Sequence, residues 1–282
     1  MSVKVTSVVE NIEGAAQKKP PGAGRDPTRL VKLLRGVEAD GAAAHGDLEI
    51  AEIAYDSRKV KPGTLFVAIH GEKTDGNKFV RDALARGAVA IVSEEARPEA
   101  IPGEIPWIKV PDARKALAGA AANYFGHPAE VLKLVGVTGT NGKTTTSYLV
   151  DSILRAAGCE VGLFGTIAYR LVRESRPAIH TTPESLDLQN FLAEVVRAGG
   201  THAVLEASSH ALALDRLWGS PLRWRFSRIS LATTWIITKH LTIILPPNVV
   251  CSRAPAARRP ARASSIVTIP TANSLPGSRH GR

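Results

Sequence analysis

Short apolar runs rich in β-branched residues alternate with stretches of helical periodicity along the first part of the chain. Over residues 27–111 this alternation predicts an α/β unit. The pattern indicates strands over 63–68 and 89–92, with a helix over 76–86 between them. These segments are the clearest elements of a first small domain.

The following segment extends the same alternation. A helix predicted over 112–124 begins at Asp112, a favourable N-cap residue, and connects the first domain to the next. A strand, a glycine-rich turn, a helix and a second strand then follow in the order of a βαβ unit, which predicts a mainly parallel sheet. The expected elements are strands over 132–138, 161–164 and 203–205 and helices over 143–157 and 183–197.

The regular pattern ends after Leu217. Residues 218–282 contain no acidic residue, many prolines and no sustained helical period. We therefore expect a flexible lead-in over 1–26, an α/β domain over 27–111, a partial α/β domain over 112–217, and a basic tail over 218–282 that is disordered or poorly packed.

The charge distribution weighs against two classes of partner. A net charge of +10 would favour nucleic acid or an anionic membrane if it were spread along the chain. Residues 1–217 instead carry 26 Lys and Arg against 26 Asp and Glu, so all of the excess lies in the tail. The most apolar window, residues 235–245, is about half as long as a membrane helix. We expect no nucleic-acid or membrane partner and, without a signal-peptide pattern at the start, a cytoplasmic location.

A glycine-rich segment over 137–146 lies where a predicted strand ends and a helix begins. Glycines let backbone N–H groups approach phosphate oxygens, and the helix N-terminus adds a favourable dipole. Lys143 offers a cation, and Thr144 a hydroxyl that can bind Mg²⁺. The general G-x-x-x-x-G-K-[ST] spacing is missed, because Val137 occupies the place of the first glycine. The alternative to a nucleotide-binding site is a chance Gly-Lys-Thr in a loop. If the segment is a nucleotide-binding site, we predict that the residues that contact the nucleotide are Gly139, Thr140, Asn141, Gly142, Lys143, Thr144 and Thr145.

Two polar motifs have both a structural and a functional explanation. Residues 56–58 (Asp-Ser-Arg) follow an apolar run and could be a solvated strand end. Thr181 and Thr182 precede Pro183, which suits the first helical position. Thr182 is therefore either a plain N-cap or, with Thr181, a donor to an anionic ligand at a helix start.

Glu206 ends the strand over 203–205. A carboxylate at the carboxyl edge of a parallel sheet faces the crevice where such folds bind ligands, which favours a functional role. His210 follows at a helix start, where a structural role and a ligand role are equally open.

These motifs together resemble the Mur ligase family. The sequence GTNGKTTT over 139–146 resembles the nucleotide loop of Mur ligases and cyanophycin synthetases, with a close variant in folylpolyglutamate synthases. Upstream motifs resemble the UDP-sugar domain shared by the ligases for the third residue and for the final dipeptide. Downstream motifs resemble the third-residue ligase, so that the resemblance covers about 50–217. The upstream motifs are 56–58, 63–68, Gly71 and 75–76; the downstream motifs are 162–171, 180–183 and 206–212.

The resemblance implies an α/β fold, with a small N-terminal UDP-sugar domain and an incomplete P-loop-like ATPase domain. It implies phosphoryl transfer from ATP to the D-glutamyl γ-carboxylate of UDP-N-acetylmuramoyl-dipeptide, with Mg²⁺. The acyl phosphate then reacts with the amine of diaminopimelate or L-lysine, between which the sequence does not choose. Relatives usually act as monomers, so a monomer is expected.

Individual roles also follow from the resemblance. It assigns Ser57 to the uridine nucleotide, and Thr181 and Thr182 to the muramoyl-peptide end of the substrate. Ser208 and Arg216 correspond to substrate contacts, with a surface salt bridge as the alternative for Arg216. The implied catalytic residues are Lys143, Glu206 and His210, and the implied metal ligands are Thr144, Glu206 and His210.

The resemblance stops after Gly219. Relatives continue with a segment like VFTNLTRDHLDYH and a lysine that the family carbamylates, and neither follows here. The residues from Arg225 onward can be assigned codons that, when translated in a shifted reading frame, encode that segment. We expect a frameshift near 218–222, in the gene or in its sequencing, and an inactive or nearly inactive chain as written.

Two other functions stay open. One is a different amide ligase of the superfamily; residues 180–183 weigh against the final-dipeptide ligase, and residues 56–58 with their domain against a folylpolyglutamate-type enzyme. The other is a non-enzymatic binder whose basic tail, with Trp218, Trp224 and Trp235 near arginines, contacts nucleic acid.

Overall fold

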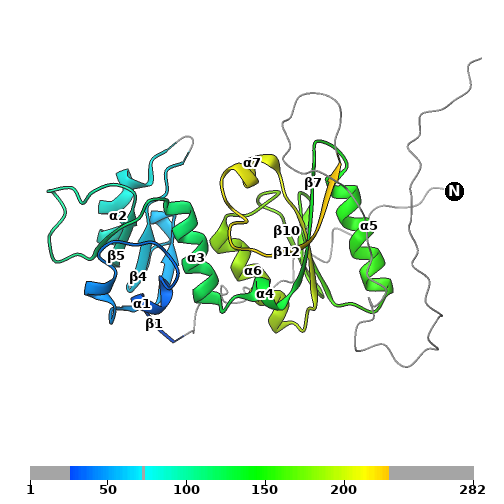
Figure 1. Cartoon of the computed structure of the whole chain (residues 1–282), viewed down its shortest axis with the longest axis horizontal. Helices are drawn as coiled ribbons and strands as arrows, with labels where there is room; N and C mark the ends of the chain where they lie inside the picture. Colours follow the sequence, from blue (N-terminus) through cyan, green and yellow to red (C-terminus); the bar gives the residue numbers. More distant parts are fainter. Residues whose placement is uncertain (1–25, 72–73, 229–282) are drawn as a thin grey trace, which may run out of the picture.

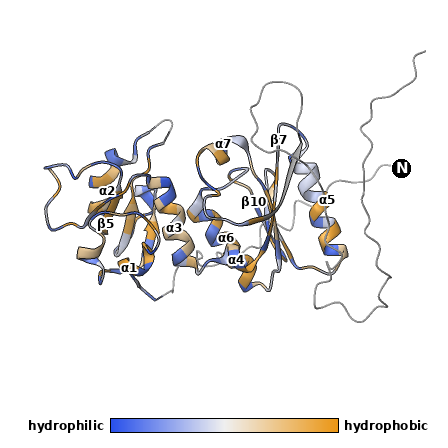
Figure 2. Ribbon diagram, in the orientation of Figure 1, coloured by the Kyte–Doolittle hydropathy of each residue, from blue (hydrophilic) through white to orange (hydrophobic). Residues whose placement is uncertain are grey.

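A computed structural model of the chain describes residues 26–71 and 74–228. The described chain forms two α/β units that lie side by side (Figure 1). Strands in both units are largely apolar, whereas the helices carry polar and apolar faces (Figure 2). No helix in the described ranges is long and apolar enough to cross a membrane.

The first unit is built on a four-stranded parallel sheet in the order β3-β4-β5-β6. A two-stranded antiparallel ribbon, β1-β2, lies beside it. The strands are β1 (Thr28–Arg29), β2 (Glu49–Ile50), β3 (Glu52–Ala54), β4 (Thr64–Val67), β5 (Ala88–Ser93) and β6 (Trp107–Lys109). The helices are α1 (Leu30–Leu33), α2 (Val80–Ala85), α3 (Ala113–Phe125) and the 3-10 turns η2 (Ala43–His45), η3 (Ser57–Lys59) and η4 (Gly76–Phe79).

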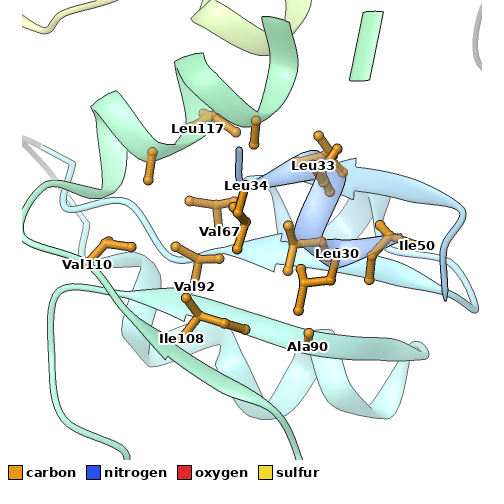
Figure 3. Packing of buried hydrophobic residues seen from close by; sticks show 14 of the residues in the cluster. Leu30, Leu33, Leu34, Ile50, Val67, Ala90, Val92, Ile108, Val110 and Leu117 are labelled. Atoms are coloured by element: carbon orange, nitrogen blue, oxygen red, sulfur yellow. The ribbon is translucent and has the colours of Figure 1, made fainter. Parts of the chain in front are cut away.

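Helix α3 belongs to the core of the first unit although it also faces the second. Its Leu117 packs with Leu33 of α1 and with Val67 and Val92 of the sheet (Figure 3). Asp112 caps the helix, accepting the backbone N–H of Lys115 at 3.0 Å, as the sequence predicts. The helix ends at Gly126, and both Gly126 and His127 are left-handed, with φ of 74° and 54°.

The second unit is built on a six-stranded sheet in the order β10-β9-β8-β11-β7-β12. Strands β8, β11, β7 and β12 are parallel, and β9 and β10 extend the sheet as an antiparallel hairpin. The strands are β7 (Lys133–Gly139), β8 (Val161–Phe164), β9 (Ala168–Leu171), β10 (Glu174–Pro177), β11 (His202–Glu206) and β12 (Leu222–Arg228). The helices are α4 (Pro128–Val131), α5 (Lys143–Ala156), α6 (Ser185–Arg197) and α7 (Ser209–Ala213).

Helices cover both faces of this sheet, as the predicted α/β class requires. Leu154 of α5 packs against Val135 and Val204 on one face. Leu188 and Leu192 of α6 pack against the other face, toward the first unit (Figure 1). Leu186 of α6 also packs against the core of the first unit, so the two units share apolar contacts.

Several predicted elements are confirmed, and two are corrected. Strand β8 has the predicted bounds, and α5 and β11 match their predictions closely. The helix predicted over 76–86 begins instead as the 3-10 turn η4, at whose start the Asp75 side chain accepts the N–H of Asn77 at 2.9 Å. The helix predicted from Pro183 begins only at Ser185.

The expectation that packing ends at Leu217 is wrong for the next few residues. Strand β12 pairs with β7 in parallel, and the Leu222 side chain packs against the core of the second unit. Its side chain fits there because Gly136 on β7 leaves room; a Cβ at Gly136 would lie 3.0 Å from Leu222 Cδ1. The predicted lead-in up to residue 25 and the tail beyond Arg228 lie outside the described residues. The frameshift near 218–222 stays a prediction.

Candidate functional site

The glycine-rich segment forms a turn between β7 and α5. Gly139 has φ 135° and Gly142 has φ 79°, backbone conformations that strain other residues. Gly142 is the N-cap of α5, so no side chain caps the first N–H groups of this helix. Those groups and the helix dipole leave a site suited to an anion at the end of β7.

Lys143 and Thr144 open helix α5 and turn toward different partners. The Lys143 ammonium donates to the carbonyl of Gly139 at 2.8 Å, which keeps the cation at the turn. The Thr144 hydroxyl donates to Glu206 Oε2 at 3.0 Å. Thr140, Asn141 and Thr145 are exposed at the same turn.

Glu206 is fully buried at the carboxyl end of β11, between β7 and β8. Its Oε2 accepts the hydroxyls of Thr144 and Thr166, the latter at 3.1 Å. Its Oε1 accepts the N–H of Thr166 at 3.2 Å and lies 3.4 Å from the hydroxyl of Ser147. Gly165 makes room for this carboxylate, because a Cβ there would lie 2.2 Å from Oε1.

The predicted substrate residues of the second unit meet beside Glu206. The Thr182 hydroxyl donates to the Glu206 carbonyl at 2.7 Å and accepts the N–H of Ser208 at 3.2 Å. Arg216 Nη1 donates to the Thr182 carbonyl at 2.9 Å, and the Thr181 and Thr166 hydroxyl oxygens lie 3.2 Å apart. The sequence therefore predicted a set of residues that the fold brings together.

Two structural alternatives are decided by these contacts. Thr182 is not the N-cap of α6, because Glu184 occupies that position and accepts the N–H of Ser185. Arg216 is not in a surface salt bridge: its side chain is 19% exposed and its Nε lies 3.4 Å from the buried Glu184 Oε2.

The two other predicted site residues are Ser57 of the first unit and His210, two residues after Ser208. Ser57 is buried in the first unit, at the start of η3, after the capping residue Asp56. A hydrogen bond from the Arg58 guanidinium lowers the pKa of Asp56. His210 lies exposed on α7, and the described part of the chain holds no group of three His, Cys, Asp or Glu side chains that could bind a metal.

Sequence reasoning missed several residues of the site. Thr166 and Gly165 follow β8 directly, so the rule that singled out Glu206, proximity to the carboxyl end of a parallel strand, applies to them too. Ser147 lies one turn into α5 and carried no signal of its own. Glu184 was passed over as an ordinary helix residue.

The donor set fits a hard divalent cation. Glu206 supplies carboxylate oxygens and Thr144 a hydroxyl oxygen, and both belong to the oxygen class that Mg²⁺ prefers. The carboxylate is buried among hydroxyls and one backbone N–H. Its negative charge could therefore bind a cation at this position.

Comparison with known proteins matches both units. The family model described as "Mur ligase middle domain" matches residues 137–231. The model described as "Mur ligase family, catalytic domain" matches residues 49–125. The first match begins within β7 and extends past β12, and the second includes all four strands of the first unit's parallel sheet.

Individual relatives agree with these matches. A protein of Solibacter usitatus (strain Ellin6076) named UDP-N-acetylmuramoyl-L-alanyl-D-glutamate--2,6-diaminopimelate ligase is 54% identical over 171 residues, which are 61% of this chain and 34% of the relative. A protein of the same name from Geobacter metallireducens (strain ATCC 53774 / DSM 7210 / GS-15) is 45% identical over 190 residues, 67% of this chain and 36% of the relative. The chain thus spans about a third of the length of these relatives.

A solved structure leads to the same family. The structure titled with the same ligase name superposes with a TM-score of 0.60 at 29% identity, covering 75% of this chain and 42% of the other. With two Mur ligase domain models matched along it, the chain belongs to the Mur ligase family.

Proposed function

We propose that the chain is part of an ATP-dependent amide ligase that adds diaminopimelate to UDP-N-acetylmuramoyl-L-alanyl-D-glutamate in peptidoglycan synthesis. The observation that carries the proposal is the contact between Thr144 and Glu206, which joins the glycine-rich turn to a buried carboxylate. The names of the relatives at 54% and 45% identity favour this ligase over the other Mur-type and folylpolyglutamate-type enzymes. They also favour diaminopimelate over L-lysine.

In this reaction the protein mainly positions the reactants and stabilises the negative charge of the phosphoryl group. A D-glutamyl carboxylate oxygen takes the γ-phosphoryl group of ATP and ADP leaves; the amine then attacks the acyl carbon, releasing phosphate and a proton. In this proposal the N–H groups at the start of α5 and the Lys143 ammonium bind the nucleotide phosphates. Thr144 and Glu206 would hold Mg²⁺, which when bound would supply positive charge beside the transferring phosphoryl group.

The substrate residues divide between the two units. Thr181, Thr182, Ser208 and Arg216 lie beside Glu206 and would bind the muramoyl-peptide end. Ser57, in the first unit, would contact the uridine nucleotide. His210 remains a proposed metal ligand. A cytoplasmic location, a monomeric state and the absence of nucleic-acid and membrane partners belong to the same proposal.

Calorimetric titration tests the proposal on the chain itself. We expect the chain to bind a non-hydrolysable ATP analogue with Mg²⁺, and to bind UDP-N-acetylmuramoyl-L-alanyl-D-glutamate independently. Lys143→Met should weaken nucleotide binding at least about tenfold, since a charge-assisted contact contributes roughly 1.5–3 kcal/mol. The exposed Lys78→Met is the matched control. Absence of binding for both ligands would overturn the proposal.

A further inference from the structure

A buried carboxylate lies between two guanidinium groups from different parts of the molecule. Glu184 Oε2 is 3.1 Å from Nη1 of Arg114, on α3, and 3.4 Å from Nε of Arg216, which follows α7. Glu184 Oε1 accepts the N–H of Ser185 at 3.0 Å. The Glu184 side chain is 9% exposed, so these groups replace most of the water that would otherwise solvate its charge.

Arg114 connects this carboxylate to the first unit. It lies in the first turn of α3, whose Leu117 is buried in the core of that unit. Its Nη2 also donates to the carbonyl of His70, in the loop after β4, at 3.1 Å. A shift of the first unit relative to the second would therefore change the contact between Arg114 and Glu184.

Arg216 connects the same carboxylate to the candidate site. Its Nη1 donates to the Thr182 carbonyl, and the Thr182 hydroxyl donates to the Glu206 carbonyl. Arg216 Nε is buried and has no hydrogen-bond partner in the described residues, so its attraction to Glu184 at 3.4 Å is what holds that side of the guanidinium. The direction of Arg216 thus depends on where Glu184 is held.

We propose that Glu184 is a positioning residue that couples the arrangement of the two units to the site. While Arg114 holds Glu184, the carboxylate fixes the Arg216 guanidinium and the Thr182 segment in the geometry described above. Without Arg114, a buried carboxylate retains only one cation, and Arg216 reorients to compensate. The link to substrate binding rests on the proposed function, in which Thr182 and Arg216 contact the muramoyl-peptide end.

The test uses the full chain with Arg114→Gln, Glu184→Gln and the double variant. Lys115→Gln is the matched control, because Lys115 is the next residue of α3 and lies 3.9 Å from Asp215 of the second unit, at the surface. The local readout is amide hydrogen exchange at Ser208, whose N–H donates to Thr182. The amide of Leu205, within β11, serves as the internal reference.

We expect Arg114→Gln and Glu184→Gln to speed exchange at Ser208 about tenfold, with Leu205 unchanged. Affinity for UDP-N-acetylmuramoyl-L-alanyl-D-glutamate should fall about tenfold, while affinity for the Mg²⁺-bound ATP analogue stays within about twofold. The double variant should be no worse than the stronger single variant, because both act on one contact. Arg114→Lys keeps the charge but has one nitrogen in place of the Nη1 and Nη2 groups that reach Glu184 and His70, so it should give intermediate values. It serves as the test variant if Arg114→Gln does not fold.

Two results would overturn the coupling. One is unchanged exchange at Ser208 in both single variants. The other is equal acceleration at Ser208 and Leu205, which would mean a general loss of stability. Failure of the proposed function has a different signature, since the unaltered chain would then not bind the UDP-muramoyl dipeptide, and the exchange measurement would still decide the coupling.

Discussion

The Tyr55 hydroxyl of the first unit donates to Asp187 Oδ2 of the second, with 2.5 Å between the two oxygens. Burial and the neighbouring Asp187 charge raise the pKa of Tyr55 above its usual range, so the phenol stays protonated and able to donate. The contact joins a residue just after β3 to the first turn of α6. Like the ion pair between Arg114 and Glu184, it adds a polar contact to the apolar ones between the two units.

Tyr55→Phe should destabilise the chain by about 1–2 kcal/mol, because it leaves the half-buried Asp187 carboxylate without this donor. Urea unfolding at neutral pH measures the change. Tyr148→Phe is the control: its ring lies near Arg170 but its hydroxyl makes no hydrogen bond in the described residues, so the free energy of unfolding should stay within about 0.5 kcal/mol. Equal effects of the two variants would contradict the role given to Tyr55.

Gly165→Ala should disturb the candidate site directly. The added Cβ would lie 2.2 Å from Glu206 Oε1, so either the carboxylate or the β8 end must move. We expect a loss of about 1–3 kcal/mol in the free energy of unfolding, together with weaker binding of the Mg²⁺-bound ATP analogue. Gly103→Ala is the matched control, since its Cβ would meet only the Arg97 side chain, at 3.7 Å. Unchanged nucleotide binding in Gly165→Ala would argue against Glu206 as part of that site.

Asp151→Asn should be strongly destabilising. Asp151 is buried on α5 and pairs with Arg155 at 2.9 Å and with Arg170 on β9. Removing its charge leaves two partly buried guanidinium groups without their anion, and loss of one partner of a buried pair costs about 3–5 kcal/mol. Asp47→Asn breaks the pair with Arg29, in which Asp47 is 92% exposed, and should cost less than about 0.5 kcal/mol. Thermal unfolding of both variants checks the difference.

Protonation of His202 should lower the free energy of unfolding as the pH falls below about 6.5. Burial, and to a smaller extent the charge of Lys133, lower the pKa of His202 from 6.5 to about 4. As the pH falls, the unfolded chain therefore takes up this proton before the folded chain does. The contribution is complete above pH 6.5 and is lost as the pH falls toward 4, by at most about 3 kcal/mol.

His202→Gln isolates this effect from the titration of carboxylates. Urea unfolding of both proteins at several pH values between 7.5 and 4.5 should show the steeper decline in the unaltered chain. Parallel curves for the two proteins would show that His202 does not contribute to the pH dependence.

Much of the second unit could be predicted from the sequence because its signals are local. Strand β8 is a short apolar run, α5 starts after a glycine turn, and Glu206 ends an apolar strand. The sheet rule then places Glu206 beside the turn before α5 without any knowledge of distant contacts.

The remaining features depend on contacts between distant segments. The role of Thr182 is set by Glu206 and Ser208, more than twenty residues away, and a local capping rule could not include them. The strand β12 was not predicted, because its segment is basic, has no helical period and shows only a short alternating pattern. It is a strand because it pairs with the distant strand β7. The role of Glu184 depends on Arg114, seventy residues before it.

The backbone at the end of α3 is the covalent link between the two units. Because Leu117 packs in the core of the first unit, α3 belongs to that unit and would move with it. The torsions that can absorb a rotation are then those of Gly126 and His127, the left-handed pair directly after the helix. Arg114 lies at the opposite end of α3 from this pivot. A rotation at Gly126 would therefore displace the Arg114 guanidinium, at the far end of the helix, from Glu184.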